Sequence, residues 1–276
     1  MPREPRVVLL TGSEKRHRYA AAVIGERVDL VGVVTEATSD SRPSALLSPD
    51  DRGTIGRHLA ERDAVECQLL GEPPTLSEGM LLRPPGGDVN EPEVADWIQQ
   101  RQPDLLVVFG ASIIRAPLLD LFSARIVNVH LGLSPYYRGA ATNFWPLVDR
   151  KPECVGATIH LAVTHVDAGP ILGQLRPSAD ARDRAHHLGT KTIIMAFRVL
   201  PRVLQRYCDN RITPVEQRVA DGRVFRRAAF SAAAVRRMWT NFETGMMPEY
   251  VRHAEARCRA YPIVPVIEEE MNADPV

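Results

Sequence analysis

Two polar side chains share one face of a short apolar run near the middle of the chain. Asn128 and His130 alternate with valines at the end of this run. Because side chains on a β-strand repeat every two residues, the amide and the imidazole project to the same side. Both groups can donate hydrogen bonds to an oxygen atom on which negative charge builds. The run therefore predicts a reactive site at the end of one strand.

A second group of polar residues follows further along the chain. Thr158 and His160 again lie two residues apart on a predicted strand, so they share one face. Asp167 stands in a turn, and the Gly169-Pro170 pair confines the backbone there. The carboxylate is therefore presented from a loop, and from this loop it could reach the imidazole of the earlier strand.

These segments resemble the folate-dependent formyltransferase family, which includes glycinamide ribonucleotide, methionyl-tRNA and sugar-amine formyltransferases. The motifs of that family stand here as Asn128-Val129-His130, Leu133-Ser134-Pro135-Tyr136-Tyr137-Arg138-Gly139, Gly156-Ala157-Thr158-Ile159-His160 and Asp167-Ala168-Gly169-Pro170-Ile171. The resemblance is dense over residues 103–172 and thin elsewhere. It implies transfer of a formyl group from 10-formyltetrahydrofolate to a primary amine of a small biosynthetic metabolite, such as an amino sugar on a nucleotide carrier.

The reaction that the resemblance implies needs three kinds of group. An amine that attacks a formyl carbon builds negative charge on the oxygen and positive charge on the nitrogen. Asn128 and His130 can supply hydrogen-bond donors to the oxygen. Asp167 near His130 would favour the imidazolium, and it could receive the amine proton directly or through water. We therefore predict these three residues as catalytic, with no metal site.

The resemblance also implies two binding regions. The segment after residue 108 and the turn around Asp167 should enclose the pterin of the folate, largely through backbone hydrogen bonds. The folate contacts implied are Phe109, Gly110, Ile113, Ile114, Val166 and Gly169, although Phe109, Ile113 and Ile114 could equally be core. The amine substrate is expected near the first strand, with contacts from Gly12, Ser13, Arg16, Arg138, Thr158 and His160. The basic cluster of residues 15–18 suits an anion at a helix start, but a solvated helix face is the alternative.

The elements that position these residues alternate between strands and helices. Strands are predicted at residues 7–11, 30–35, 105–110 and 126–130, and helices at 14–24, 55–70, 91–102, from about 140, and 183–206. Residues 36–49 and 73–87 are rich in loop-forming residues. This order predicts an α/β fold with an open, doubly wound, mostly parallel Rossmann-like sheet, the formyltransferase fold, whose ligands bind beyond the carboxyl ends of the strands.

The pattern changes near residue 207. Residues 214–219 and 223–227 are short β-like runs separated by Ala220-Asp221-Gly222, which is a hairpin signal. Residues 232–242 and 248–259 then have helical spacing. We predict a catalytic domain over residues 1–206 and a small α+β C-terminal appendage over residues 207–276.

The composition favours small partners. The chain has 276 residues and zero formal net charge, which gives no electrostatic reason to expect nucleic acid or an acidic membrane. We expect the amine and the folate as partners, and a homodimer is compatible with the sequence. Without an apolar run of about 20 residues or a signal peptide, we expect a cytoplasmic protein that does not enter membranes. The four cysteines lack CxxC spacing, so neither zinc nor disulfides are indicated.

Other functions fit the sequence less well. Methionyl-tRNA formylation requires a basic C-terminal barrel, whereas this chain predicts one hairpin, helices and the acidic end Glu268-Glu269-Glu270. Hydrolysis of 10-formyltetrahydrofolate usually involves a regulatory domain ahead of the catalytic one, and we expect no room for it before Val7. A non-catalytic binding module on the same fold is opposed by the intact catalytic set. Dinucleotide oxidoreduction is opposed by Thr11-Gly12-Ser13, which stands where Gly-x-Gly-x-x-Gly would begin.

Overall fold

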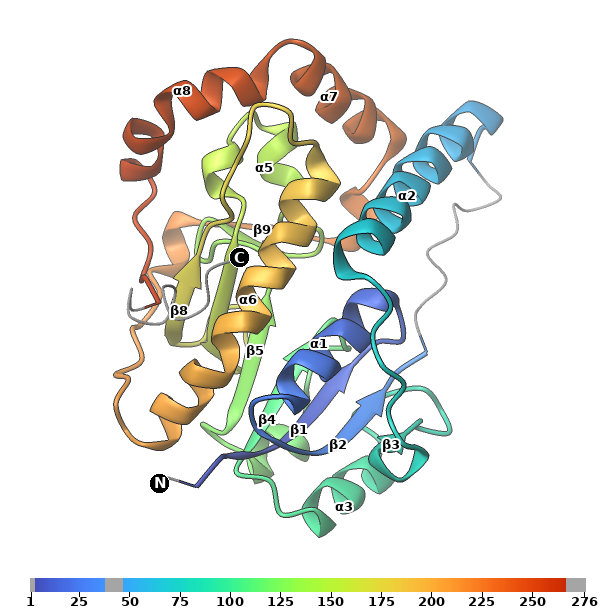
Figure 1. Cartoon of the computed structure of the whole chain (residues 1–276), viewed down its shortest axis with the longest axis vertical. Helices are drawn as coiled ribbons and strands as arrows, with labels where there is room; N and C mark the ends of the chain where they lie inside the picture. The colour runs from blue at the N-terminus through green and yellow to red at the C-terminus, as the bar shows by residue number, and fades with distance from the viewer. Residues whose placement is uncertain (1–2, 38–46, 267–276) are drawn as a thin grey trace.

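The computed structural model describes residues 3–37 and 47–266, and these residues fold around a seven-stranded sheet (Figure 1). Its strands are β1 (Arg6–Thr11), β2 (Asp29–Thr35), β3 (Leu81–Leu82), β4 (Leu105–Phe109), β5 (Ile126–His130), β7 (Ala157–Leu161) and β8 (Ile171–Leu175). They lie in the order β3-β2-β1-β4-β5-β7-β8. The pairs from β3 to β5 are parallel, and β7 and β8 add two antiparallel pairs. The predicted mostly parallel α/β fold is confirmed.

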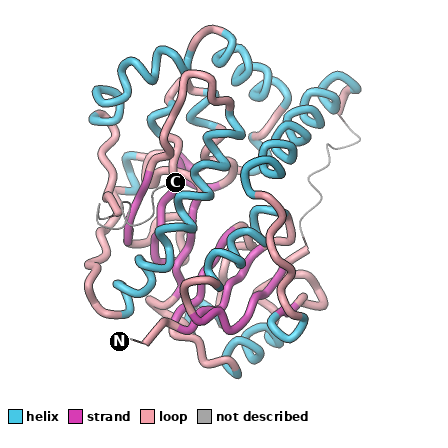
Figure 2. The backbone as a smooth tube through the Cα atoms, in the orientation of Figure 1, coloured by secondary structure: helices cyan, strands magenta, loops and turns pink. Residues whose placement is uncertain are grey.

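Helices cover both faces of the sheet, as Figure 2 shows. They are α1 (Lys15–Gly25), α2 (Pro49–Leu70), α3 (Pro92–Gln100), α4 (Leu118–Leu121), α5 (Trp145–Val148), α6 (Ala185–Cys208), α7 (Ala232–Glu243) and α8 (Met246–Arg259). Alternate residues of β1 and β4 face opposite ways, as period-2 side chains must. Leu9 and Val107 pack with α1 and α6, whereas Leu10 and Val108 pack with α3 and α4.

The same alternation orients the polar residues of β5. Val127 and Val129 belong to the core under α1 and α6, and Ile126 belongs to the core under α3 and α4. Asn128 and His130 therefore project to the face of the sheet that lies away from α6. They occupy the carboxyl-terminal half of this strand, beyond the last apolar side chain on that face.

The C-terminal helices share a core with the middle of the chain. Residues of α7 and α8, including Met238 and Tyr250, pack with Trp145 of α5 and with Leu188 of α6. In Figure 1 these two helices lie across the top of the molecule. A small two-stranded sheet of β6 (Tyr137–Gly139) and β9 (Arg223–Phe225) also joins the C-terminal part to the loop after β5.

The predicted hairpin around Asp221-Gly222 is wrong. Val215 instead pairs with Ile171 of β8, and β9 pairs in parallel with β6. Gly222 is required for a close approach, because a Cβ atom there would lie 1.5 Å from the Pro135 carbonyl oxygen. An Asp-Gly pair was therefore a signal for tight packing against a distant loop and not for a turn between paired strands.

Other boundaries differ for local reasons. The helix predicted from residue 55 begins at Pro49, because the Ser48 side chain accepts a hydrogen bond from Asp51 N and caps it. The helix predicted from about Ala140 begins at Trp145, since residues 137–139 form β6. The predicted loop 36–49 is described only at residues 36–37 and 47–49, and Glu268-Glu269-Glu270 lie outside the described residues.

Within the described part of the chain, no helix has the length and apolarity needed to span a bilayer.

Candidate active site

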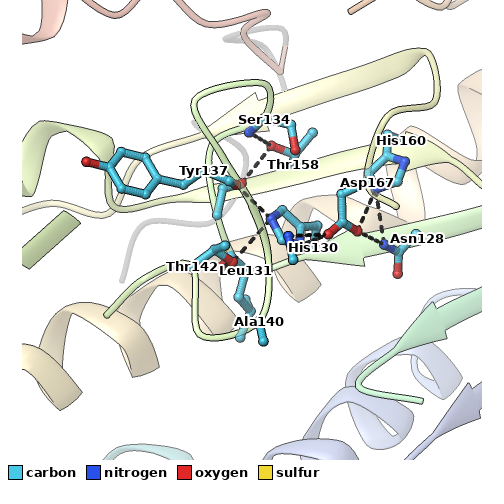
Figure 3. A network of polar contacts seen from close by, with 12 residues as sticks. Asn128, His130, Leu131, Ser134, Tyr137, Ala140, Thr142, Thr158, His160 and Asp167 are labelled. Atoms are coloured by element: carbon cyan, nitrogen blue, oxygen red, sulfur yellow. Dashed lines mark hydrogen bonds and ion pairs between the residues drawn. The ribbon is translucent and has the colours of Figure 1, made fainter. Parts of the chain in front are cut away.

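The pairing of β5 with β7 gathers four polar side chains. In this antiparallel ladder Asn128 lies opposite His160, and His130 lies opposite Thr158. Residues opposite each other in antiparallel strands have Cβ atoms about 4.5–5.5 Å apart on one face. Two Asn/Thr-x-His patterns that are distant in the sequence thus become one cluster, which Figure 3 shows from close by.

Asp167 lies at the centre of this cluster. Its Oδ1 accepts a hydrogen bond from Asn128 Nδ2 at 3.1 Å, and its Oδ2 lies 3.3 Å from His130 Nδ1 (Figure 3). The backbone N–H of Gly139 donates to Oδ2 at 2.8 Å. The carboxylate is presented from a left-handed backbone with φ of 46°, which Asp tolerates better than most residues. The amide, the imidazole and the carboxylate predicted to meet are therefore in contact.

Both ring nitrogens of His130 lie beside oxygen atoms of the protein. Its Nε2 lies 3.1 Å from the Tyr137 carbonyl oxygen and 3.2 Å from Thr142 Oγ1. The Thr142 hydroxyl donates its one hydrogen to Leu131 O at 2.6 Å, so it can only accept a hydrogen bond from His130. Because Nδ1 faces Asp167, each ring nitrogen faces oxygen acceptors. His130 is only 6% exposed, so its contacts are mainly with other residues of the cluster.

Burial and charge act against each other in this pair. Burial lowers the pKa of His130, and the Asp167 carboxylate opposes that shift. Burial would raise the pKa of Asp167, but the neighbouring His130 and His160 rings and the Gly139 N–H hold it well below its ordinary value. The carboxylate is therefore ionised at neutral pH, and it is 12% exposed. Asp167 is therefore a largely buried negative charge in contact with the Asn128 amide.

Asn128 is held from two sides. His160 Nδ1 lies 2.8 Å from the Leu161 carbonyl oxygen, so this nitrogen carries a proton. His160 Nε2 lies 3.0 Å from Asn128 Nδ2 and 3.6 Å from Asp167 Oδ1. Asn128 Nδ2 thus serves both His160 and Asp167. Donation from this amide to a substrate requires the exchange of one of these contacts.

Thr158 braces the loop that follows β5. Its hydroxyl donates to Gly132 O at 2.7 Å and accepts from Ser134 N at 3.0 Å. Gln174 Nε2 adds a hydrogen bond to the same hydroxyl at 2.9 Å. Because Thr158 has no exposed surface, its contacts are all within the protein. Among the described residues, no three His, Cys, Asp or Glu side chains gather as ligands of a metal would.

The end of β1 lies beside the end of β4. The His17 ring is buried between Gly12 and Gly110, since a Cβ atom at either glycine would lie 2.5–2.6 Å from it. Ser13 is exposed at this edge. Arg16 is partly buried and forms ion pairs with Glu14 and with Glu66 of α2.

The remaining basic side chains of this region are also engaged. Lys15 and Arg18 pair with Glu72. Arg138, on the other side of the cluster, donates to the Val219 carbonyl oxygen at 3.1 Å. The cationic groups predicted to meet an anionic substrate thus have protein partners in this structure.

The predicted folate contacts divide into core and rim. Phe109 and Ile114 are buried, and the Phe109 ring lies 4.7 Å from that of Phe197. Ile113 is 60% exposed and Val166 is 38% exposed. Gly110 has a φ of 68° and is exposed, whereas Gly169 is buried against Leu161.

Two residues that support the site were missed from the sequence. Thr142 accepts from His130, as described above, and Glu36 holds the loop after β4. The buried carboxylate of Glu36 accepts from Ser112 N at 2.7 Å and from Val89 N at 2.8 Å. Neither residue belongs to a recognisable motif, and only the position of Glu36 directly after a strand could have drawn attention to it.

The chain belongs to the formyl transferase family, whose profile matches residues 17–204. The protein is therefore a transferase that moves a formyl group, and the family predicted from the motifs of β5, β7 and the Asp167 turn is confirmed.

Solved structures of formyltransferases share the fold. Glycinamide ribonucleotide transformylase 1 from Symbiobacterium toebii has a TM-score of 0.53 at 19% identity, covering 78% of this chain and 96% of that chain. Phosphoribosylglycinamide formyltransferase from Anaplasma phagocytophilum has a TM-score of 0.51 at 17% identity, covering 75% and 89%. An N-formyltransferase from Helicobacter canadensis, in complex with folinic acid and dTDP-3-aminofucose, has a TM-score of 0.52 at 16% identity, covering 81% and 71%.

Proposed function

We propose that this protein transfers the formyl group of 10-formyltetrahydrofolate to a primary amine of a small metabolite, with an amino sugar on a nucleotide carrier as the favoured acceptor class. The observation that carries the proposal is the contact of the Asp167 carboxylate with both Asn128 and His130. The complex of the Helicobacter canadensis N-formyltransferase with folinic acid and dTDP-3-aminofucose supports the donor and acceptor classes.

In the proposed reaction the amine nitrogen attacks the formyl carbon. A carbon–nitrogen bond forms, and the carbonyl oxygen gains negative charge that the Asn128 amide stabilises after exchanging one of its protein contacts. The amine proton passes to Asp167, whose negative charge is stabilised by His130. The bond between the formyl carbon and N10 of the folate then breaks, and N10 takes up a proton. Pre-organised donors of this kind typically contribute about 10²–10³ in rate.

The rim of the site suits a flat heterocycle. Ile113 and Val166 expose apolar surface on the two loops that the resemblance assigns to the pterin, and Ala162 of the second loop packs in the same core as Ile114. Glu36 immobilises the backbone of the first loop by accepting from Ser112 N. A loop held in this way can offer its other backbone groups to a ligand at low entropic cost.

The acceptor would lie where the ends of β1 and β4 meet. Ser13 supports this placement because it is exposed at this edge, whereas the His17 ring covers Gly12. The ion pairs of Lys15, Arg16 and Arg18 weaken the case for a phosphate at this helix start. The structure therefore supports a binding place for the amine end of the acceptor better than one for a phosphate.

The proposal is tested by mass spectrometry of a panel of amine metabolites incubated with the protein and 10-formyltetrahydrofolate. Nucleotide-linked amino sugars should gain one formyl group, and the gain should disappear with the His130→Ala protein, whose fold is checked by circular dichroism. The assignment to amines is overturned if no member of the panel gains a formyl group while 10-formyltetrahydrofolate is consumed.

A further inference from the structure

We infer that residues 215–225, here called the strap, position the Asp167 carboxylate against His130, and that Gln217 is the main positioning residue of the strap. The inference rests on the proposed function, because it concerns the residue proposed to take the amine proton. The strap bonds to both loops that hold Asp167, and it comes from the part of the chain beyond the segment that matches the formyl transferase family.

The strap first holds the turn that carries Asp167. Val215 and Ile171 exchange two backbone hydrogen bonds of 2.8 Å, which close the turn at its far end. Gln217 Nε2 donates to the Gly169 carbonyl oxygen at 2.6 Å, two residues from Asp167. Gly169 is tightly packed, since a Cβ atom there would lie 1.8 Å from the Leu161 carbonyl oxygen. The side chain of Gln217 therefore fixes a peptide that has little room to move.

The strap then holds the loop on the opposite side of the carboxylate. Phe225 pairs with Gly139 in the small sheet, and its carbonyl oxygen accepts from Ala140 N at 2.8 Å. The Phe225 ring stacks between Tyr137 and Trp145, with centroids at 5.6 and 4.8 Å and interplanar angles of 5° and 12°. These stacking contacts fix the distance between the sheet and the loop that carries Gly139.

The two loops meet at Asp167 itself. Gly139 N, from the loop held by Phe225, donates to Asp167 Oδ2 at 2.8 Å. The same oxygen lies 3.3 Å from His130 Nδ1. A shift of the Asp167 turn would change both distances, and a shift of the Gly139 loop would weaken one of the two contacts that hold this oxygen. A segment bonded to both loops can therefore hold the carboxylate at the distance that proton transfer needs.

Substitution of Gln217 can test the positioning of Asp167 without disrupting the fold. Gln217 lies outside the cluster of catalytic side chains, and it contributes a single side-chain hydrogen bond from a half-buried site. Gln217→Ala removes this bond. Gln217→Glu keeps the length and shape of the side chain but places an acceptor against the Gly169 carbonyl oxygen. The two variants thus remove the same bond in different ways.

The test compares these variants with Gln100→Ala, which removes an exposed glutamine at the end of α3. We expect both Gln217 variants to lower kcat by about tenfold to a hundredfold, with KM for folate and amine nearly unchanged, since misplacement of about 1 Å can cost a hundredfold. Nitrogen NMR of labelled histidines in the full chain should show a shifted His130 signal in both variants and no shift with Gln100→Ala.

Unchanged kcat and unchanged His130 signals in both Gln217 variants would overturn the proposed role of the strap. A rise in KM with kcat preserved would also overturn it, because it would indicate that Gln217 contacts a substrate. If the wild-type protein formylates no amine, the proposed function fails, but the NMR comparison still decides whether the strap positions the cluster. Failure of the two proposals is therefore distinguishable.

Discussion

Replacement of Asp167 by asparagine should abolish formyl transfer and leave the protein folded. The carboxylate oxygens face Gly139 N at 2.8 Å, Asn128 Nδ2 at 3.1 Å and His130 Nδ1 at 3.3 Å. An asparagine side chain has one acceptor oxygen, so at least one of these donors would face an NH₂ group. An unsatisfied buried donor costs about 1–3 kcal/mol, which is less than the roughly 5–15 kcal/mol of stability of a typical domain.

The loss of activity should be much larger than this loss of stability can explain. Removal of a positioned proton acceptor typically slows a reaction by about 10²–10⁴. The pKa of His130 should also fall further, because Asp167 is the largest of the influences that raise it against burial. Single-turnover formylation would be measured beside urea denaturation, with Asp180→Asn as a control, since that carboxylate is exposed and pairs with Arg182. A folded Asp167→Asn protein within tenfold of the wild-type rate would refute the reasoning.

Three further changes test the surroundings of the site. Gly139→Ala should destabilise the protein more than Gly245→Ala, because both have positive φ but only the first Cβ would clash, at 2.2 Å from Phe225 O; equal urea midpoints would contradict this. Glu36→Gln should raise KM for the folate by roughly tenfold with little change in kcat, because one amide oxygen cannot satisfy two backbone N–H groups; unchanged steady-state kinetics would show that the loop after β4 does not contact the folate. Burial also lowers the pKa of three histidines far below 6.5, to about 3, 4 and 3 for His17, His58 and His186. The unfolded chain therefore binds more protons below pH 6.5, so the unfolding free energy should fall by about 2 kcal/mol per histidine between pH 7 and pH 5, and His58→Phe should reduce this slope.

The sequence was sufficient to predict β1, β2, β4, β5, β7 and the central cluster, but β3 lies within the predicted loop 73–87 and β8 was not predicted. Alternation of apolar and polar residues on two strands placed Asn128 with His130 and Thr158 with His160 on single faces, and the register of β5 and β7 makes these pairs neighbours. The pattern depends only on the two-residue repeat of a strand and on burial of the other face, which are local properties.

Contacts between distant segments could not be predicted in the same way. Gly222 read as a turn residue, but the reason for the glycine is the Pro135 carbonyl oxygen, which belongs to another loop. The cluster around Arg16 read as a basic helix start, but Glu66 and Glu14 neutralise its guanidinium. In both cases the partner is chosen by tertiary packing, which leaves no periodic signal in a single sequence.

The most direct test of the account follows the formyl carbon itself. With 10-formyltetrahydrofolate labelled in the formyl carbon and a saturating acceptor amine, quenched-flow measurement should find the label in the amine in a one-to-one ratio with the tetrahydrofolate released. Label released as formate at the same rate with and without the amine would contradict the account, because water and not an amine would then be the group that attacks beside Asp167.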